Sequence, residues 1–389
     1  MSFDQKIDRR GTHCSKWDSM EALYGVSPED GLAMWVADMD FRPPQCVQDA
    51  VQAMVDHGVY GYFGDESKYR AAIQWWMKER HGWVIEPDWI FSLHGLVNGT
   101  AMCVETYTKP GDGVILFTPV YHAFARVISA ADRKVVEMEM VNTDGRYTMD
   151  FDAYDAAMTG NEKMVILCSP HNPGGRVWTQ EELQQVADFC KRHDLILVSD
   201  EIHHDLTYGA KHTAMSLVDP SITDRLIMMT AATKTFNIAG SHIGNVIIED
   251  PNLRAQFAKR MAGLGLSPNS FGLFMVTAAY TPEGAAWVDE LMAYLAENQR
   301  IFNVGINAIP GLKAMPLEAT YLSWVDFAGT GMAREEFTAR VQDQAKIAVN
   351  HGPTFGKGGD SFLRFNIAAP SAIVEDAVTR MQAAFSDLQ

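Results

Sequence analysis

An alternation of apolar runs and amphipathic stretches, between Trp83 and Ile248, places the strongest constraint on the fold of this chain. Each run is short and nearly continuous in apolar residues, whereas the stretches between runs have helical periodicity. Such a rhythm is typical of a mostly parallel sheet that helices cover on both faces. We therefore predict a large α/β domain with a mostly parallel, seven-stranded sheet made of Trp89–Leu93, Val114–Phe117, Lys134–Met138, Met164–Cys168, Leu195–Ser199, Leu226–Met229 and Asn245–Ile248.

The helices are predicted from their apolar periodicity and from their end signals. Thr179-Gln-Glu-Glu182 has the pattern of a capping box, which makes this helix start the best defined in the chain. Gly58 and Gly82 are suited to end two helices that precede the sheet. The predicted helices of this part are Pro44–His57, Lys68–His81, Gly99–Tyr107, His122–Ala131, Thr179–His193 and Asn252–Met261.

A chain of 389 residues is too long for one compact core, and its rhythm changes after Pro282. A long helical region, Glu283–Ala308, is followed by three strand-like pieces and two helices, which indicates a smaller α+β domain. We expect an N-terminal arm (1–45) that packs with the small domain and the active site, a large domain (46–282) and a small domain (283–389). The pieces of the small domain are Tyr321–Val325, Arg334–Ala345, Lys346–Val349, Phe362–Ile367 and Ile373–Phe385.

Composition excludes several classes of protein. The formal net charge of −17 opposes binding to nucleic acid or to an anionic membrane, so a small-molecule ligand is expected. No apolar run approaches the roughly 20 residues of a membrane span, and the N-terminus lacks the apolar core of a signal peptide. The five cysteines are odd in number and form no C-x-x-C pair, which favours reduced thiols in the cytoplasm over disulfides or zinc.

Lys234 follows the predicted strand Leu226–Met229 in a loop that carries no other charge. One interpretation is an ordinary loop lysine whose ammonium reaches solvent. The other is an amine whose pKa is lowered by partial burial so that it can form a Schiff base. Taken alone, this stretch favours the first interpretation.

Three further strand ends carry polar or aromatic residues, and by the rule for parallel sheets they converge with Lys234 on one edge. They supply Tyr121 after one strand, Asn172 after another, and Asp200 with His203 after a third. A fifth segment, 93–100, joins a strand to a helix start and offers backbone N–H groups to an anion. An amine, a carboxylate, an aromatic ring, an amide and an anion cradle are the parts that bind pyridoxal phosphate (PLP).

The three segments 169–176, 199–206 and 233–240 resemble the fold-type I aminotransferase superfamily of PLP-dependent enzymes. They read Ser-Pro-His-Asn-Pro-Gly-Gly-Arg, Ser-Asp-Glu-Ile-His-His-Asp-Leu and Thr-Lys-Thr-Phe-Asn-Ile-Ala-Gly. Within that superfamily, the segments 35–41 and 362–368, together with His203, resemble the MalY/PatB-type cystathionine β-lyases, nearly end to end. The resemblance implies a PLP-dependent carbon–sulfur lyase, and a homodimer whose active sites are shared between subunits.

The resemblance also implies roles for single residues. Lys234 matches the Schiff-base lysine, which also removes the Cα proton of the substrate, and Asp200 matches the carboxylate that keeps the pyridine nitrogen protonated. Arg364 matches the arginine that holds the substrate α-carboxylate. The other expected cofactor residues are Leu96, Val97 and Thr233 at the phosphate, Tyr121 on the ring, Asn172, His203, and Tyr62 from the neighbouring subunit; Trp35 and Asp38 are expected near the substrate.

Two positions depart from the family pattern. Ala231 stands where the family usually has serine, and His242 stands where many aminotransferases have a phosphate-binding arginine. Both departures concern the phosphate end of the expected site.

The implied reaction is an α,β-elimination from an amino-acid thioether that gives a thiol, pyruvate and ammonia. An aminotransferase is the alternative, because it shares every step up to the carbanion; His203, where aminotransferases more often carry tyrosine, favours the lyase. A PLP-fold regulator that acts through a protein partner is a further alternative. No metal site is expected, because adjacent histidines such as His203 and His204 would face opposite ways on an extended segment.

Overall fold

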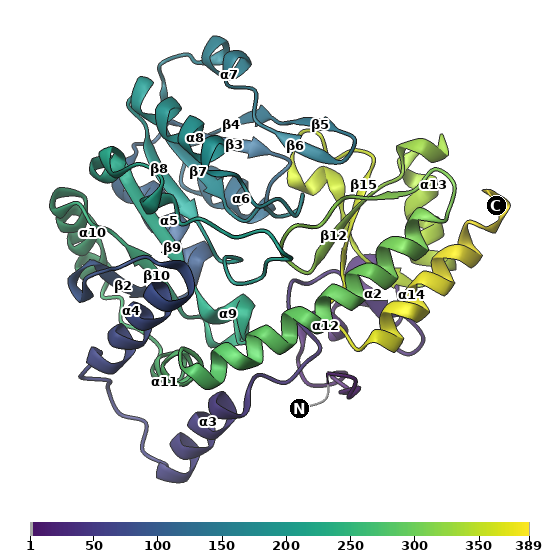
Figure 1. The fold of residues 1–389 in the computed structure, drawn as a ribbon, viewed down its shortest axis with the longest axis horizontal. Helices are drawn as coiled ribbons and strands as arrows, with labels where there is room; N and C mark the ends of the chain where they lie inside the picture. The colour runs from purple at the N-terminus through teal and green to yellow at the C-terminus, as the bar shows by residue number, and fades with distance from the viewer. Residues whose placement is uncertain (1–2, 389) are drawn as a thin grey trace.

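The computed structural model describes residues 3–388, which are organised around a seven-stranded and a four-stranded sheet. In Figure 1 the long helix α12 (Pro282–Asn307) runs from beside α11 (Ser270–Ala279) to beside α14 (Ser371–Ala384), so that one helix spans both sheets. No helix among the described residues is long and apolar enough to cross a membrane.

The large sheet has the strand order β2-β10-β9-β8-β7-β3-β4. Only β10 runs antiparallel to its neighbours, so the prediction of a mostly parallel, seven-stranded sheet is confirmed. Every residue of the inner strands β3 and β9 is buried, as near-continuous apolar runs predict. The strands are β2 (Ile90–Leu93), β3 (Gly113–Thr118), β4 (Lys134–Glu139), β7 (Glu162–Cys168), β8 (Ile196–Asp200), β9 (Leu226–Thr230) and β10 (Gly244–Ile247).

Helices cover the large sheet on both faces. Side chains of α5 (Leu96–Tyr107), α6 (His122–Ala130) and α10 (Pro251–Leu264) share one apolar cluster with the strands, and α8 (Gln180–Arg192) contributes to the other. The predicted capping box of α8 is confirmed, with the Thr179 hydroxyl accepting the Glu182 N–H at 3.2 Å. Helices α3 (Gln45–His57) and α4 (Ser67–His81) end, as predicted, at left-handed glycines.

The predicted start of α5 at Gly99 was three residues late. The helix begins at Leu96, because Gly95 takes φ +90° at the N-cap and turns the chain directly from β2 into the helix. This turn leaves the N–H groups of the first helical residues without partners inside the helix.

The small sheet has the order β11-β12-β15-β14. Its strands are β11 (Lys313–Ala314), β12 (Leu322–Asp326), β14 (Asn350–His351) and β15 (Phe362–Asn366). Two sequence predictions differ in detail. The helix predicted over Arg334–Ala345 is α-helical only in α13 (Arg334–Ala339) and continues as a π-helix. The predicted strand Lys346–Val349 is shorter, as β13 (Ile347–Ala348), and pairs with β1 (Leu32–Ala33) outside the small sheet.

Residues 35–39, which we name the strap, lie between the small sheet and the large one. Asn366 on β15 donates to the carbonyls of Val36 and Asp38 at 2.6 and 2.5 Å. On the other side Asn237, which follows β9, donates to the Met39 carbonyl at 2.9 Å. The strap therefore connects both sheets through its own backbone.

Arg176 is almost fully buried and joins segments that are far apart in the sequence. Its guanidinium donates to both carboxylate oxygens of Glu182 (3.0 and 2.7 Å), to Glu318 (3.0 Å) and to the Tyr147 carbonyl. Arg146 reaches the same Glu318 at 2.7 Å, but from an exposed position, with 47% of its side chain accessible.

We expect Arg176→Met to lower the free energy of unfolding by about 3 kcal/mol, because it leaves buried acceptors without donors. Arg146→Met should cost under about 1 kcal/mol, since an exposed ion pair contributes little. Calorimetric melting of the two variants beside the parent protein checks this. Equal losses of stability would contradict the role assigned to Arg176.

Candidate active site

A cavity of about 570 Å³ opens at the carboxyl ends of β7, β8 and β9. Its lining comes from the segments that the strand-end rule brings together, together with the strap. Eight of the predicted site residues line it: Leu96, Val97, Tyr121, Asn172, Asp200, His203, Thr233 and Lys234.

Lys234 lies on α9 (Ala232–Thr235), a single helical turn that follows β9. Its Nζ donates to the Ala37 carbonyl of the strap at 2.6 Å. Loss of surrounding water lowers the pKa of Lys234 to about 8, with the carboxylates of Asp38 and Asp200 acting in the opposite direction. Of the two interpretations drawn from sequence, the geometry therefore fits the amine with a lowered pKa.

Asp200 is the last residue of β8, is buried and lines the same cavity. Its Oδ1 accepts one hydrogen bond, from the Ile202 N–H at 3.1 Å. Burial raises the pKa of Asp200 to about 7, and the neighbouring Glu201 adds to the rise, whereas Lys234 and His204 oppose it. An acid and an amine that both titrate near neutrality therefore share one cavity.

Arg364 extends from β15 to the edge of the cavity. Its guanidinium donates to the side-chain oxygens of Asn172 (3.0 Å) and Asn350 (2.5 Å) and to the Trp35 carbonyl (2.9 Å). Its Nε is buried and has no hydrogen-bond partner among residues 3–388. Burial lowers the pKa of Arg364 to about 10, which still leaves the group cationic at neutral pH. The small sheet thus presents a positive charge to Asn172, which lines the cavity.

One end of the cavity can hold an anion. The first residues of α5, Leu96 and Val97, line it, and helix N-termini attract negative charge. Close packing supports this turn from beneath, since a Cβ added to Gly244 would lie 2.7 Å from Leu96 Cδ2. His242 also lines the cavity, from a left-handed conformation with φ +46°.

Four predicted residues lie outside the cavity lining: Arg364, described above, and Tyr62, Trp35 and Asp38. Tyr62 is fully exposed at 106% relative accessibility, and it borders a different cavity. The backbone carbonyl of Trp35 accepts a hydrogen bond from Arg364 at the edge of the cavity. Its indole N–H donates to the Lys16 carbonyl at 2.7 Å. Asp38 is paired with Arg9 at 2.8 Å.

The extended conformation expected for His203 and His204 was wrong, because residues 202–205 form a turn after β8. His203 lines the cavity, and its buried Nδ1 has no partner within the described part of the chain. His204 lies behind the cavity in a buried group with His81 and Asp205, whose ligand-type atoms are all within 4.8 Å of one another. Sequence reasoning missed this group because α4 supplies His81.

Comparison with known proteins agrees with this geometry. A family model for class I and II aminotransferases matches residues 32–381. The chain belongs to the class I and II aminotransferase family. It is 36% identical to cystathionine beta-lyase PatB of Bacillus subtilis (strain 168), over 99% of this chain and 100% of the relative. It is 31% identical to protein MalY of Escherichia coli (strain K12), over 97% and 96% of the two chains.

A solved structure extends the comparison to three dimensions. Cystalysin from Treponema denticola, described as containing a pyridoxal 5'-phosphate cofactor, matches with a TM-score of 0.94 and 38% identity, covering 100% of this chain and 99% of that chain. The predicted fold-type I architecture and the resemblance to the MalY/PatB type are both confirmed. Within the aminotransferase family this chain therefore groups with cystathionine β-lyases.

We predict that Lys234 in the cofactor-free protein reacts with formaldehyde and a hydride reagent with a half-maximal rate near pH 8. Unperturbed lysines titrate near pH 10.4, so their methylation should still be rising at pH 10. Peptide mass spectrometry of samples labelled from pH 6 to pH 10 measures this, with Lys234→Arg identifying the peptide. A Lys234 profile that follows the surface lysines would contradict the lowered pKa.

Proposed function

We propose that this chain is a PLP-dependent carbon–sulfur β-lyase that converts an amino-acid thioether into a thiol, pyruvate and ammonia. The observation that carries the proposal is that Lys234 and Asp200 line one cavity, with Arg364 at its edge. The names of PatB, a cystathionine β-lyase, and of cystalysin, whose structure contains PLP, support it.

The residues present fit PLP. The N-terminus of α5, with Leu96, Val97 and Thr233, would hold its phosphate, and Tyr121 would lie on its ring. Asp200 would face the pyridine nitrogen, and Asn172 would lie near the phenolate oxygen. When bound, PLP supplies an electron sink for the charge left by removal of the Cα proton. His203 also lines this space, with a buried Nδ1 that has no partner within residues 3–388.

The side chains of the chain itself then perform the proton and binding steps. Arg364 holds the substrate α-carboxylate by a charge-assisted contact, which orients the Cα–H bond. The amine of Lys234, with a pKa near 8, takes the Cα proton and is in range to return one at neutral pH. The thiolate then leaves from Cβ. Asp38 and Trp35 are proposed near the substrate, Asp38 through its charge on Lys234.

An aminotransferase is the second candidate function. A solved structure described as a PLP-bound putative aminotransferase from Clostridium difficile 630 matches with a TM-score of 0.95 and 33% identity, over 99% of both chains. The two functions share the proton acceptor and the cofactor residues. They differ in where the proton returns, so product analysis separates them.

We predict that the PLP-loaded protein forms pyruvate from L-cystathionine without any keto-acid acceptor. Lactate dehydrogenase and NADH report the pyruvate in the same cuvette. Lys234→Ala should lower the rate by at least about 10³-fold, since it removes the group that binds the cofactor and accepts the proton. Its circular dichroism and melting temperature in the cofactor-free form should match those of the parent.

The lyase proposal fails if the parent protein makes no pyruvate but transfers an amino group to an added keto acid. Substantial lyase turnover in Lys234→Ala would remove Lys234 from its role. L-Serine serves as the control substrate, because hydroxide is a poorer leaving group than a thiolate.

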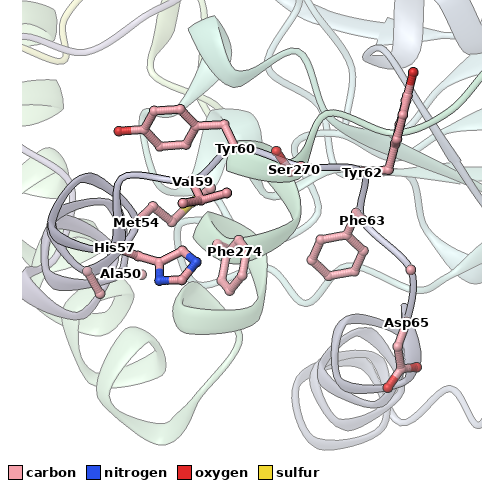
Figure 2. A pocket seen from close by; sticks show the side chains of 13 residues that line it. Ala50, Met54, His57, Val59, Tyr60, Tyr62, Phe63, Asp65, Ser270 and Phe274 are labelled. Atoms are coloured by element: carbon pink, nitrogen blue, oxygen red, sulfur yellow. The ribbon is translucent and has the colours of Figure 1, made fainter.

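A second cavity, of about 720 Å³, lies between α3, the loop 58–66 and α11. Figure 2 shows Phe63 and Phe274 side by side in this cavity, while the Tyr62 ring points away from both. Val59, Tyr60 and Phe274 are 70%, 58% and 43% exposed. A soluble protein seldom leaves such an apolar surface uncovered.

We propose that a second copy of the chain covers this surface and that Tyr62 completes the phosphate site of its partner. The complete exposure of Tyr62 supports this, since its own protomer leaves the side chain open to solvent. The five cysteines are all free thiols, which supports a cytoplasmic location for the homodimer.

We predict that a heterodimer of Tyr62→Ala with Lys234→Ala regains lyase activity that neither homodimer has. In that pair one of the two sites has both an intact Lys234 and an intact Tyr62, so about half of the wild-type rate is expected. Co-expression with two affinity tags isolates the heterodimer for assay.

The matched control is Asp200→Ala paired with Lys234→Ala. Both of these residues belong to one protomer's cavity, so every site stays defective and no activity should return. A monomeric protein in light scattering, or equal recovery in both heterodimers, would contradict a shared site.

A further inference from the structure

Asp205 lies behind the active-site cavity with its side chain fully inaccessible to solvent. It accepts hydrogen bonds from three side chains on two separate helices. Trp76 Nε1 and His81 Nε2 of α4 lie 3.0 and 2.9 Å from Oδ1, and Thr235 Oγ of α9 lies 2.8 Å from Oδ2. His204, on the same turn, pairs with Oδ2 at 3.1 Å.

The charges in this group are set by Asp205. Burial opposes ionisation, but the positive charge of His204 outweighs it and holds the pKa of Asp205 well below its usual range. Burial likewise opposes the His204 imidazolium, yet the charges of Asp205 and Glu201 raise its pKa above the usual value. Burial lowers the pKa of His81 to about 4, so this ring is a neutral hydrogen-bond donor. Asp205 and His204 thus form a buried ion pair.

Thr235 makes this ion pair relevant to the reaction, because it is the residue after Lys234. The helix α9 has only four residues, too few to fix its own position. The Thr235 side chain is completely buried, and its hydroxyl proton has one acceptor, Asp205. The carboxylate therefore holds the Lys234 turn from the side opposite the cavity.

We propose that Asp205 is a positioning residue for the reaction, which fixes Lys234 through Thr235 and keeps a positively charged His204 beside Asp200. The inference rests on the proposed function. His204 favours the ionised form of Asp200, and Glu201 opposes it. The ionisable groups around His204 are Asp200, Glu201, His203 and Asp205 on its own segment, His81 on α4, His212, and Lys234 on α9.

An ion pair between His204 and Asp205 explains the geometry better than a metal ion does. The two histidines approach different oxygens of Asp205, His81 the Oδ1 and His204 the Oδ2. Trp76 and Thr235 occupy further acceptor positions on the same carboxylate, so its capacity is already used.

The first test is a pair of substitutions at Thr235 in the PLP-loaded protein. Thr235→Val keeps the shape but removes the donor, and kcat for pyruvate formation should fall by about 10- to 100-fold, since small misplacements of a reacting group are costly. Thr235→Ser keeps the hydroxyl and should stay within about threefold of the parent. Equal rates in the two variants would overturn the proposal.

The second test compares two buried carboxylates of the same turn. Glu201 pairs with His212 at 2.8 Å and accepts from Ser199 and Met215; among residues 3–388 none of these side-chain contacts reaches the Lys234 turn. Asp205→Asn should lower kcat and move the acid limb of its pH profile to higher pH, because His204 then loses its charge and the pKa of Asp200 rises. Glu201→Gln should move that limb to lower pH, since a negative neighbour of Asp200 is removed.

A readout that needs no turnover separates this proposal from the proposed function. The pH midpoint of the visible band of bound PLP should shift in Asp205→Asn and Thr235→Val, and stay at the parent value in Thr235→Ser. If the parent makes no pyruvate, the lyase proposal fails, while this titration still tests the position of Lys234.

A merely structural role predicts a different outcome. Asp205→Asn and Glu201→Gln would then lose melting temperature to a similar extent, with unshifted band midpoints and pH profiles, and the proposal would be wrong. Stoichiometric metal in the parent that Asp205→Asn loses, measured by elemental analysis, would equally overturn the ion-pair interpretation.

Discussion

The structure depends on keeping an amine and a carboxyl away from water at one edge of one sheet. Asp200 ends β8, and in the sheet it lies opposite Met229 of the adjacent strand β9, which leads directly to Lys234. Removal of water disfavours both charged forms, so the two pKa values approach each other, to about 7 and about 8. Neighbouring parallel strands end at the same edge of a sheet, so the topology of the backbone alone brings Asp200 and Lys234 to one place.

The backbone carbonyls of the strap accept hydrogen bonds from side chains that belong to both sheets' sides of the active-site cavity. Arg364 and Asn366 are two residues apart on β15, so their side chains leave the same face of the strand. Arg364 donates to the carbonyl of Trp35, and Asn366 to those of Val36 and Asp38. Lys234 then donates to the Ala37 carbonyl between them. The groups proposed for substrate and for proton transfer are therefore held by consecutive peptide units.

Sequence predicted the sheet and the cavity lining well, because both follow from local periodicity and from the rule for strand ends. The start of α5 was placed late, since Gly95 has an unusual φ that apolar periodicity does not report. The pairing of Asp38 with Arg9, and the meeting of Arg364 with Asn172 across 192 residues, depend on tertiary contacts that leave no local pattern. Tyr62 was placed in the site by resemblance alone, and a single protomer leaves it exposed.

Asp200, which ends β8, and Asp205, in the turn that follows, show how different surroundings give the same side chain two uses. Asp200 accepts one backbone N–H and has a pKa near 7, which leaves it able to respond to a bound partner. Asp205, five residues on, accepts from Trp76, His81 and Thr235 and pairs with His204, and its pKa is held well below the usual range. Burial is similar for both, so the difference comes from the charge of His204 paired with Asp205, together with the donors around it. A buried carboxylate with neither a paired cation nor several donors titrates near neutrality, and one with both becomes a fixed charge around which a catalytic turn can be built.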